Sequence, residues 1–198
     1  MNRTVLAALA AIIVASAMTA PASAQTVSGG VTLTGAIAAR CGTVDTGSTS
    51  VSGSINLGEL SASTGELNPV LVNSTTNSPA GAAVFRLGCS GSAFRVTLSA
   101  SRLDNIGFPP VDPPGSSVVD YTVEAKIALA TGGFALVDYT TAAATPAPTV
   151  QTVNSFVANL TDNFDIRVFG FHPDNGDAAL MVAGSYSGDI TFLVAPLP

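Results

Sequence analysis

Apolar and polar positions alternate in residues 31–40, V-T-L-T-G-A-I-A-A-R, which lead directly into Cys41. The odd-numbered positions of this stretch form one face, whose members are Val31, Leu33, Gly35, Ile37 and Ala39. Period-two alternation is typical of a half-buried β-strand, although Ala36 and Ala38 weaken the contrast. A strand that precedes the rest of its domain can fold back on that domain or pair with the open edge of another one.

Further strands are predicted wherever apolar residues alternate between turn signals. The segments are 54–60, 83–89, 94–98, 118–130, 134–139, 164–171 and 186–198, with a weaker candidate at 150–160. The Ser90-Gly91-Ser92 turn predicts a β-hairpin between the strands on its two sides, and residues 131–133 predict a second strand pair. In the last segment, one face carries Ile190, Phe192 and Val194, preceded by Tyr186.

Polar or proline-rich stretches are predicted to be loops. Residues 101–117 contain four prolines, residues 140–149 are rich in alanine and proline, and residues 61–79 predict turns around a short apolar piece at 70–72. No segment predicts a convincing helix. Many short strands with closely spaced turns predict an all-β sandwich with immunoglobulin-like character.

Residues 1–24 are typical of a secretory signal peptide and are expected to lie outside the fold. Arg3 gives a positive start, an apolar run follows at 5–20, and Ala22-Ser23-Ala24 supplies the small residues of a cleavage site. The run is shorter than the about 20 apolar residues of a membrane span. Cleavage after Ala24 would leave an N-terminal extension, residues 25–40, and one domain, residues 41–198.

Charge and length narrow the class of protein further. Without Arg3, the chain has six basic and 13 acidic residues, a net charge of about −7. So few basic residues disfavour a nucleic acid or an anionic membrane surface as a partner. Removal of 24 residues from 198 leaves 174, which is enough for one domain with a sizeable core.

The chain has two cysteines, Cys41 and Cys89. In an exported chain, a small and even number of cysteines favours a disulfide. A metal site or a catalytic thiol is the weaker alternative, because the only histidine, His172, is far away in sequence.

No catalytic or metal-binding motif stands out. The run G-S-Y-S-G at 184–188 has tyrosine where a nucleophile elbow requires serine. The Asp and Asn residues at 162–165 and 174–177 do not match the spacing of a calcium loop and are more typical of turns. We therefore expect no enzyme, no metal site and no cofactor.

Four pieces of the chain, taken in order, resemble the spore coat protein U family and the closely similar pilins of archaic chaperone–usher pili. These pieces are residues 31–41, I-N-L-G-E-L at 55–60, A-V-F-R-L-G-C-S-G-S-A-F-R-V-T-L-S-A at 83–100, and I-R-V-F-G-F at 166–171 with A-G-S-Y-S-G-D-I-T-F-L-V at 183–194. The chain departs from the family at Leu57, where Phe is commoner, and in the long stretches 101–117 and 140–149.

The resemblance implies an incomplete immunoglobulin-like sandwich whose missing strand leaves an acceptor groove. A periplasmic chaperone would fill this groove first, and the N-terminal strand of another pilin subunit would replace it at an outer-membrane usher. The implied donor face is Val31, Leu33, Gly35, Ile37 and Ala39. The implied groove-lining residues of the last strand are Tyr186, Ile190, Phe192 and Val194. A Cys41–Cys89 disulfide would tie the donor strand to the sandwich.

The expected function is therefore that of a structural subunit of a surface pilus or fimbria, exported through the periplasm and polymerised by donor-strand exchange without inserting into a membrane. One alternative is a monomeric secreted coat or matrix protein of the same fold that closes on its own strand. Another is a surface adhesin or binding module. A tip adhesin usually has an extra N-terminal lectin-like domain and no donor strand of its own.

Overall fold

The computed structural model describes residues 34–44, 47–75, 82–111 and 113–197. The chain divides into two compact units, Met1–Gly35 and Ala36–Pro198, and the fold is that of the second unit. No helix in the described part of the chain is long and apolar enough to cross a membrane. The predicted signal peptide, residues 1–24, lies outside the described residues.

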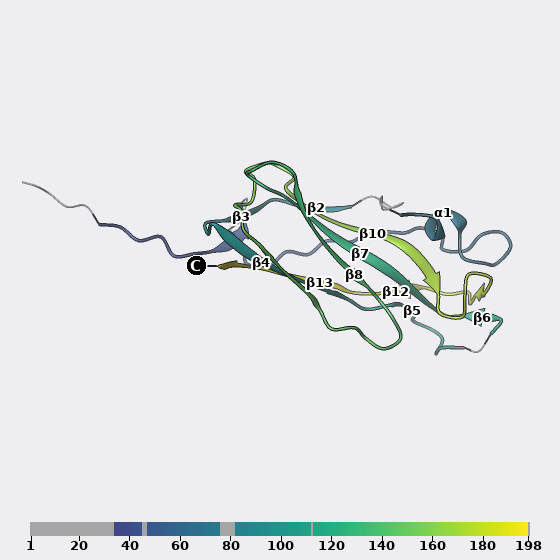
Figure 1. Ribbon diagram of the computed structural model, residues 1–198. Helices are drawn as coiled ribbons and strands as arrows, with labels where there is room; N and C mark the ends of the chain where they lie inside the picture. The colour runs from purple at the N-terminus through teal and green to yellow at the C-terminus, as the bar shows by residue number, and fades with distance from the viewer. Residues whose placement is uncertain (1–33, 45–46, 76–81, 112, 198) are drawn as a thin grey trace, which may run out of the picture. The chain divides into compact units, whose positions relative to one another are not determined.

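The described residues form thirteen strands and one short helix (Figure 1). The first elements are β1 (Cys41–Thr43), α1 (Pro69–Val72), β2 (Ala83–Phe85), β3 (Leu87–Cys89), β4 (Ala93–Ala100), β5 (Leu103–Asn105) and β6 (Gly115–Ser116). The later elements are β7 (Val118–Ala128), β8 (Phe134–Thr140), β9 (Thr149–Val153), β10 (Phe164–Pro173), β11 (Leu180–Met181), β12 (Tyr186–Ser187) and β13 (Ile190–Leu197).

The largest sheet is built around β7. One edge of β7 pairs with β10, and its other edge pairs first with β5 and then with β8, all antiparallel. β2 continues the sheet beyond β10, and β12 continues it beyond β5. The inward side chains of β7 follow the period of two, and Val119, Val123 and Ile127 are fully buried.

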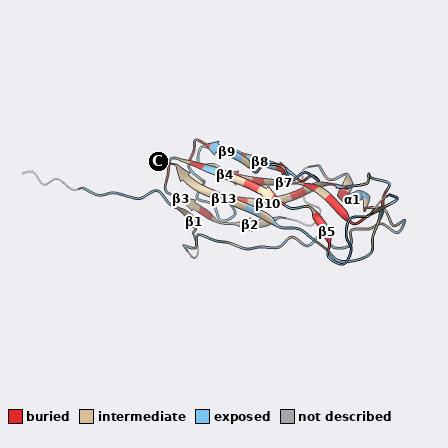
Figure 2. Cartoon of the chain, turned by 90° about the horizontal axis from the view of Figure 1, so that it is seen from below, coloured by how far each residue is buried: buried red, intermediate tan, exposed pale blue. Residues whose placement is uncertain are grey.

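A second antiparallel sheet has the order β13-β4-β9. Its central strand, β4, places Phe94, Val96 and Leu98 in the core with no exposed surface. Phe192 of β13 lies 4.7 Å from Phe164 of β10 and 5.6 Å from Phe85 of β2, measured between ring centroids. The apolar faces of the two sheets therefore share one core, and Figure 2 shows buried residues along β4, β7 and β10.

Several sequence predictions are confirmed. The described residues are nearly all β, with antiparallel sheets and a disulfide that joins Cys41 to Cys89. The pair of strands around residues 131–133 exists as β7 and β8, in a continuous register from Thr122↔Thr140 to Ala128↔Phe134. Two further pairs, β1–β3 and the parallel β6–β11, complete the described sheets.

The predicted hairpin around Ser90-Gly91-Ser92 is wrong. The strand 83–89 is interrupted at Arg86: its first half, β2, pairs with β10, and its second half, β3, pairs with β1. β4 pairs instead with β13 and β9, so the turn carries the chain from one sheet to another. Alternation shows which side chains face inward and does not show which strand supplies the backbone partner, and this explains the error.

The stretch 101–117 is not wholly a loop, because it contains β5 and β6. Leu103 and Asn105 of β5 are buried, and the Asn105 side chain donates a hydrogen bond of 3.1 Å to the carbonyl of Val182. The prolines lie between the two short strands. The loop prediction for residues 140–149 holds for 141–148, which connect β8 to β9.

The remaining strand boundaries also differ from the prediction. Residues 54–60 form no strand, and the weak candidate at 150–160 is a strand only in β9. β10 continues beyond the predicted end, to Pro173. A bulge between Phe169 and His172 shifts the alternation by one residue, so that Phe171 is buried instead of Gly170. Gly170 has a φ of 62°, a conformation that glycine adopts without strain.

The last predicted strand, 186–198, is divided between two sheets. β12 pairs with β5, and β13 pairs with β4. At Gly188, between them, a Cβ atom would lie 2.7 Å from the Arg102 carbonyl oxygen. The predicted turn around 70–72 contains α1, whose N-cap Asn68 accepts a hydrogen bond from the Val70 amide.

Candidate functional site

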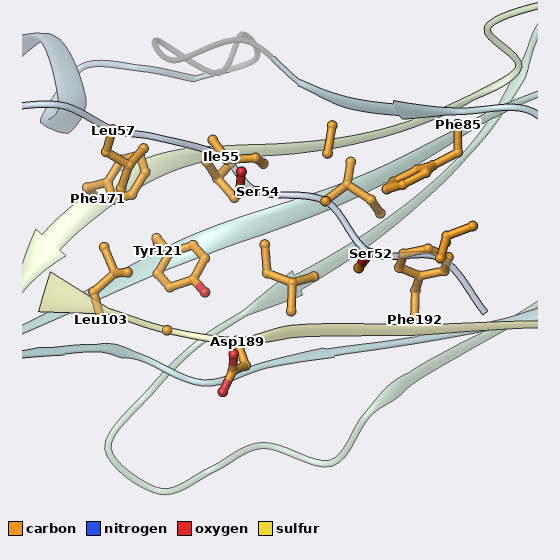
Figure 3. A pocket seen from close by; sticks show the side chains of 17 residues that line it. Ser52, Ser54, Ile55, Leu57, Phe85, Leu103, Tyr121, Phe171, Asp189 and Phe192 are labelled. Atoms are coloured by element: carbon orange, nitrogen blue, oxygen red, sulfur yellow. The ribbon is translucent and has the colours of Figure 1, made fainter.

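A groove runs between the edges of the two main sheets. It consists of three adjoining cavities, and the central one has a volume of about 370 Å³ (Figure 3). The central cavity shares Val51, Ile190 and Phe192 with one neighbour and Leu103 and Gly188, among others, with the second. We call the end of the groove at Cys41 the Cys41 end and the end at residues 181–187 the β5 end.

One wall of the groove is β13, which is an edge strand. β13 pairs with β4 on one side, and on its other side no described strand pairs with it. Alternate side chains of β13 turn into the groove, namely Ile190, Phe192 and Val194, whereas Leu193 between them is 61% exposed. An unpaired edge strand of eight residues, whose first five alternate between partly buried and exposed side chains, is a site where another strand can pair.

The opposite side of the two sheets is closed. There β8 of the large sheet packs against β9 and β4 of the other sheet. The apolar core is thus covered along one edge and open along the other, next to β13.

The segment 51–57 lies across the groove without belonging to a sheet (Figure 3). Val51, Ile55 and Leu57 line the central cavity together with the small residues Ser52, Gly53 and Ser54. Gly53 lies close to the rim, where a Cβ atom would be 3.1 Å from the ring of Phe85. Within the described residues, no backbone–backbone hydrogen bond joins this segment to a strand.

The floor near the Cys41 end is aromatic. Phe85, Phe164 and Phe192 form a cluster with ring centroids 4.7 to 5.9 Å apart. Phe85 and Phe192 are only partly buried and line the central cavity, while Phe164 lies fully buried beneath them. An apolar side chain that enters here would contact two aromatic rings.

The centre of the groove carries a polar pair. Tyr121 of β7 and Asp189 both line the central cavity, and Figure 3 shows the Tyr121 ring between the strands and the Asp189 side chain below it. Burial, followed by the negative charge of Asp189 and the nearby Tyr139, raises the pKa of Tyr121 well above its usual value. The phenol therefore stays protonated and can donate a hydrogen bond into the groove.

At the β5 end, Tyr186 is held in place by its hydroxyl group. This hydroxyl donates to the carbonyl oxygens of Val182 at 2.7 Å and Ser116 at 3.2 Å. Burial raises the pKa of Tyr186, so it too remains a neutral donor. The Asn105 side chain packs so closely on Gly184 that a Cβ atom there would be 2.5 Å away, and this contact shapes the same wall.

All four residues expected on the groove from the last segment line these cavities. Tyr186 lies at the β5 end, Ile190 and Phe192 lie at the centre, and Val194 lies at the Cys41 end. Their role as an acceptor surface remains a prediction.

The described residues of the expected donor face, Gly35, Ile37 and Ala39, do not line the groove of their own chain. Val31 and Leu33 lie outside the described residues. Ile37 is 90% exposed, Ala39 is exposed, and no described atom outside the neighbouring residues lies within 4 Å of where a Cβ atom of Gly35 would stand. Residues 36–40 belong to no strand and are attached through the Ser90 hydroxyl, which accepts from the Arg40 amide at 2.9 Å.

Sequence reasoning missed the residues that complete the groove. Tyr121 and Leu103 lie on strands remote in sequence from β13, and Asp189 lies in the break between two strands. The alternation of β7 predicts that Tyr121 is inward, but only the sheet order shows that it faces the open edge.

The described residues contain no group of three His, Cys, Asp or Glu side chains that could hold a metal ion. His172 pairs with Asp177, with 3.0 Å between Nδ1 and Oδ1, and both side chains are largely exposed. Comparison with protein-family models, curated proteins and solved structures gives no match for this chain.

Proposed function

We propose that the chain is a structural subunit of a surface pilus and that its groove takes a β-strand from another subunit. The strand would pair with the free edge of β13 and place alternate side chains in the groove, as in strand addition generally. In this proposal the two sheets form an incomplete immunoglobulin-like sandwich, and the resemblance to spore coat protein U and archaic chaperone–usher pilins supports it.

The observation that carries the proposal is the free edge of β13 beside a groove that is lined by apolar side chains together with a few polar ones. Ile190, Phe192 and Val194 present a period-two face to this groove, while the other edge of the two sheets is closed by β8 and β9. An open edge of this length favours association with other chains, and proteins usually protect such edges. A strand from another subunit would provide that protection.

Residues 25–40 are the proposed donor. Their predicted alternation matches the period of β13, and the described part of this segment is exposed instead of docked on its own domain. A chain that gives its strand to a neighbour and accepts one from another neighbour forms a heterologous contact, which extends without closing. A filament follows from that geometry.

The same proposal supplies partners and a location. A periplasmic chaperone would cover the groove before assembly, and an outer-membrane usher would catalyse the exchange of strands. The disulfide between Cys41 and Cys89 indicates an oxidising, extracytoplasmic compartment, which agrees with passage through the periplasm to the cell surface. The proposed role is structural and requires no catalysis.

One observation favours the second candidate, a secreted coat or matrix protein that remains monomeric. The segment 51–57 already lies across the groove and contributes Ile55 and Leu57 to it. It makes no backbone ladder with a described strand, however, so it leaves the edge of β13 open. This arrangement supports the pilus subunit over the self-closed protein.

Electrophoresis in SDS, before and after boiling, tests the proposal. Surface material from cells that make the full chain is compared with material from cells that make the chain without residues 25–39. Strand-linked polymers predict a ladder that only heating removes and that the deletion abolishes. A single monomer band in unboiled material from both strains would contradict the pilus proposal and support the monomeric one.

A further inference from the structure

A loop that exposes large apolar side chains follows β5. In the Ile106–Val111 loop, I-G-F-P-P-V, Ile106 is 72% exposed and Phe108 is 52% exposed, and the two prolines are exposed as well. Exposed apolar side chains that stand alone are common on protein surfaces, but several in one short loop indicate a contact surface.

This loop is held in one conformation by hydrogen bonds on both sides. The Ile106 amide donates to the Ser185 carbonyl at 2.8 Å, and the Gly107 amide donates to the Asn105 side chain at 2.9 Å. On the far side, the Ser117 hydroxyl donates to the Pro109 carbonyl at 2.9 Å. The exposed side chains are therefore presented on an anchored loop, which reduces the entropy lost on binding.

The loop lies at the β5 end of the groove. Its neighbour Ser185 lines the cavity there, and β5, from which the loop continues, pairs with β12 of the same wall. Figure 1 places β5, β6 and β12 at one end of the second unit and β3 with the C-terminal end of β13 at the other. A segment that leaves the groove at the β5 end would emerge near this loop, because Ser185 of the cavity wall is hydrogen-bonded to Ile106.

The direction of β13 determines which end of an incoming strand comes out beside the loop. β13 runs from Ile190 at the centre of the groove towards Val194 at the Cys41 end. An antiparallel partner would run the opposite way and leave at the β5 end. The sheet that contains β13 is antiparallel throughout, and antiparallel pairing is slightly more stable per residue.

A parallel partner would instead bring the second domain to the Cys41 end. The first copy's own residues 36–40, which are exposed, are attached at that same end. The N-terminal extensions of both copies would then lie beside both domains at one end of the groove. The antiparallel direction avoids this crowding. It also leaves the β5 end of one copy facing the Cys41 end of the next.

We propose that the Ile106–Val111 loop packs against the Cys41 end of a second copy of this chain, whose N-terminal strand occupies the groove. The inference rests on the proposed function, because that strand brings the second copy into place. From Ile37 to Cys41 the extended chain spans at most about 14 Å. The second domain is thus held close to Phe108, and this contact would limit bending between neighbouring subunits.

Site-specific photo-crosslinking tests the contact in assembled material. The photoreactive residue p-benzoylphenylalanine replaces Phe108 in the full chain, and a second variant carries it in place of Val150. Val150 is a matched control, because it is 57% exposed on the outer face of the other sheet, opposite Thr97. Cross-linked dimers are isolated by boiling in SDS, and the linked residues are identified by mass spectrometry.

The proposal predicts a chain dimer from the Phe108 position, with the link at residues 36–44 or 86–91 of the second copy, and severalfold less dimer from the Val150 position. Equal yields at the two positions, or links from Phe108 only within its own chain, would overturn it while the heat-sensitive ladder persisted. Absence of that ladder in the unmodified chain would overturn the pilus proposal itself, and the loop contact would fall with it.

Discussion

Asn163 shows how a single polar side chain can hold two segments of this fold together. It is 2% exposed, its amide nitrogen donates to the carbonyls of Leu87 and Ala158, and its amide oxygen accepts from the Leu87 amide, all at 2.7 Å. Both backbone groups of Leu87 therefore have the partner that a neighbouring strand would otherwise provide. This arrangement anchors β3 just where the chain leaves the sheet of β2.

Replacement of Asn163 by alanine should destabilise the domain markedly. The Leu87 amide and carbonyl would remain buried without partners, and we expect the free energy of unfolding to fall by about 3 kcal/mol. Urea unfolding measures this change. Asn159→Ala, at an exposed site whose side chain accepts from Arg86, is the control and should cost at most about 0.5 kcal/mol; equal costs would disprove the bridging role.

Glu124 predicts a pH dependence of stability. Burial, and then the charge of Asp138 directly opposite in the β7–β8 register, raise the pKa of Glu124 in the folded chain. The folded state therefore binds this proton more tightly than the unfolded state. The resulting stabilisation is fully present below the unfolded pKa and is lost as the pH rises through the folded pKa.

The variant Glu124→Gln isolates this effect, because glutamine carries no charge at any pH. We expect the variant to unfold at a higher urea concentration than the parent chain near pH 7, and the difference to shrink or vanish near pH 3, where both side chains are neutral. A gain that is equally large at both pH values would show that packing, not ionisation, explains it.

Inward and outward positions were largely predictable from sequence at the residue level. Val119, Val123 and Ile127 are buried, and their burial could be predicted because the alternation of their strand, β7, is uninterrupted. Phe171 could not be placed, because one extra residue at the bulge beside Gly170 reverses the parity of the later positions in β10. The partners of Asn163 were hidden as well, since its contacts at Leu87 lie 76 residues away.

At the scale of elements, the N-terminal segment and β13 are the two parts that the proposed exchange brings together. Ile190, Phe192 and Val194 of β13 line the groove and are partly buried, whereas Leu193 between them is 61% exposed. A donor strand that pairs with β13 must alternate in the same way, with every second side chain in the groove. Neighbouring positions of the N-terminal segment should therefore respond differently to a charge.

The matched variants Ile37→Asp and Ala36→Asp test this difference. In the lone chain both positions are exposed, so neither charge should prevent folding or formation of the disulfide. In the polymer, an aspartate at 37 would enter an apolar groove at a cost of several kcal/mol, whereas one at 36 would face outwards. Ile37→Asp should abolish the heat-sensitive ladder and Ala36→Asp should keep it. Ladders of equal intensity would contradict the donor face.

The elements themselves were predicted unevenly. β7, β8, β10 and β13 are visible in the sequence, and each is at least seven residues long. The segment 54–60 also alternates but forms no strand, because within the described residues only its last carbonyl, that of Leu60, accepts a backbone hydrogen bond, from the Asn68 amide at 2.8 Å. The alternation of apolar residues indicates which side chains are buried. A strand also needs hydrogen-bond partners for its backbone, and the alternation does not show whether these exist.

At the scale of the whole molecule, the disulfide joins β1 to β3 beside the start of the N-terminal segment. Cys41 and Cys89 face each other in the β1–β3 register and are 48 residues apart in sequence. The bond thus closes a loop that includes the segment 51–57. Loss of the disulfide would loosen both the segment 51–57 in the groove and the attachment of the proposed donor strand.

The double variant Cys41→Ser/Cys89→Ser should therefore be less stable. In the chain-entropy model, a loop of this length contributes about 4 kcal/mol, and the midpoint of urea unfolding should move to a clearly lower concentration. The parent chain with reductant should approach the same midpoint. If the variant and the oxidised parent unfold together, the disulfide does not stabilise this fold.

The assignment of strands to sheets is the part of the molecule that sequence could not supply. The chain passes from one sheet to another at the turn 90–92 and again at the break 188–189. In the sequence, however, the first has the pattern of a hairpin turn and the second that of an unbroken strand. The groove arises from these crossings, since they leave β13 at an edge. Its lining from the last segment was predictable, but Tyr121, Asp189 and Leu103 were not.

The central claim is that residue 37 of one copy lies in the groove of another. The most direct measurement places p-benzoylphenylalanine at Ile37 in surface-assembled material, with the same residue at Ala36 as the control, and maps the links after boiling and mass spectrometry. We predict chain dimers from position 37 that are linked to groove residues of a second copy, among them Leu57, Leu103 and Ile190. Links from position 37 that stay within one chain, or that match those from position 36, would contradict the account.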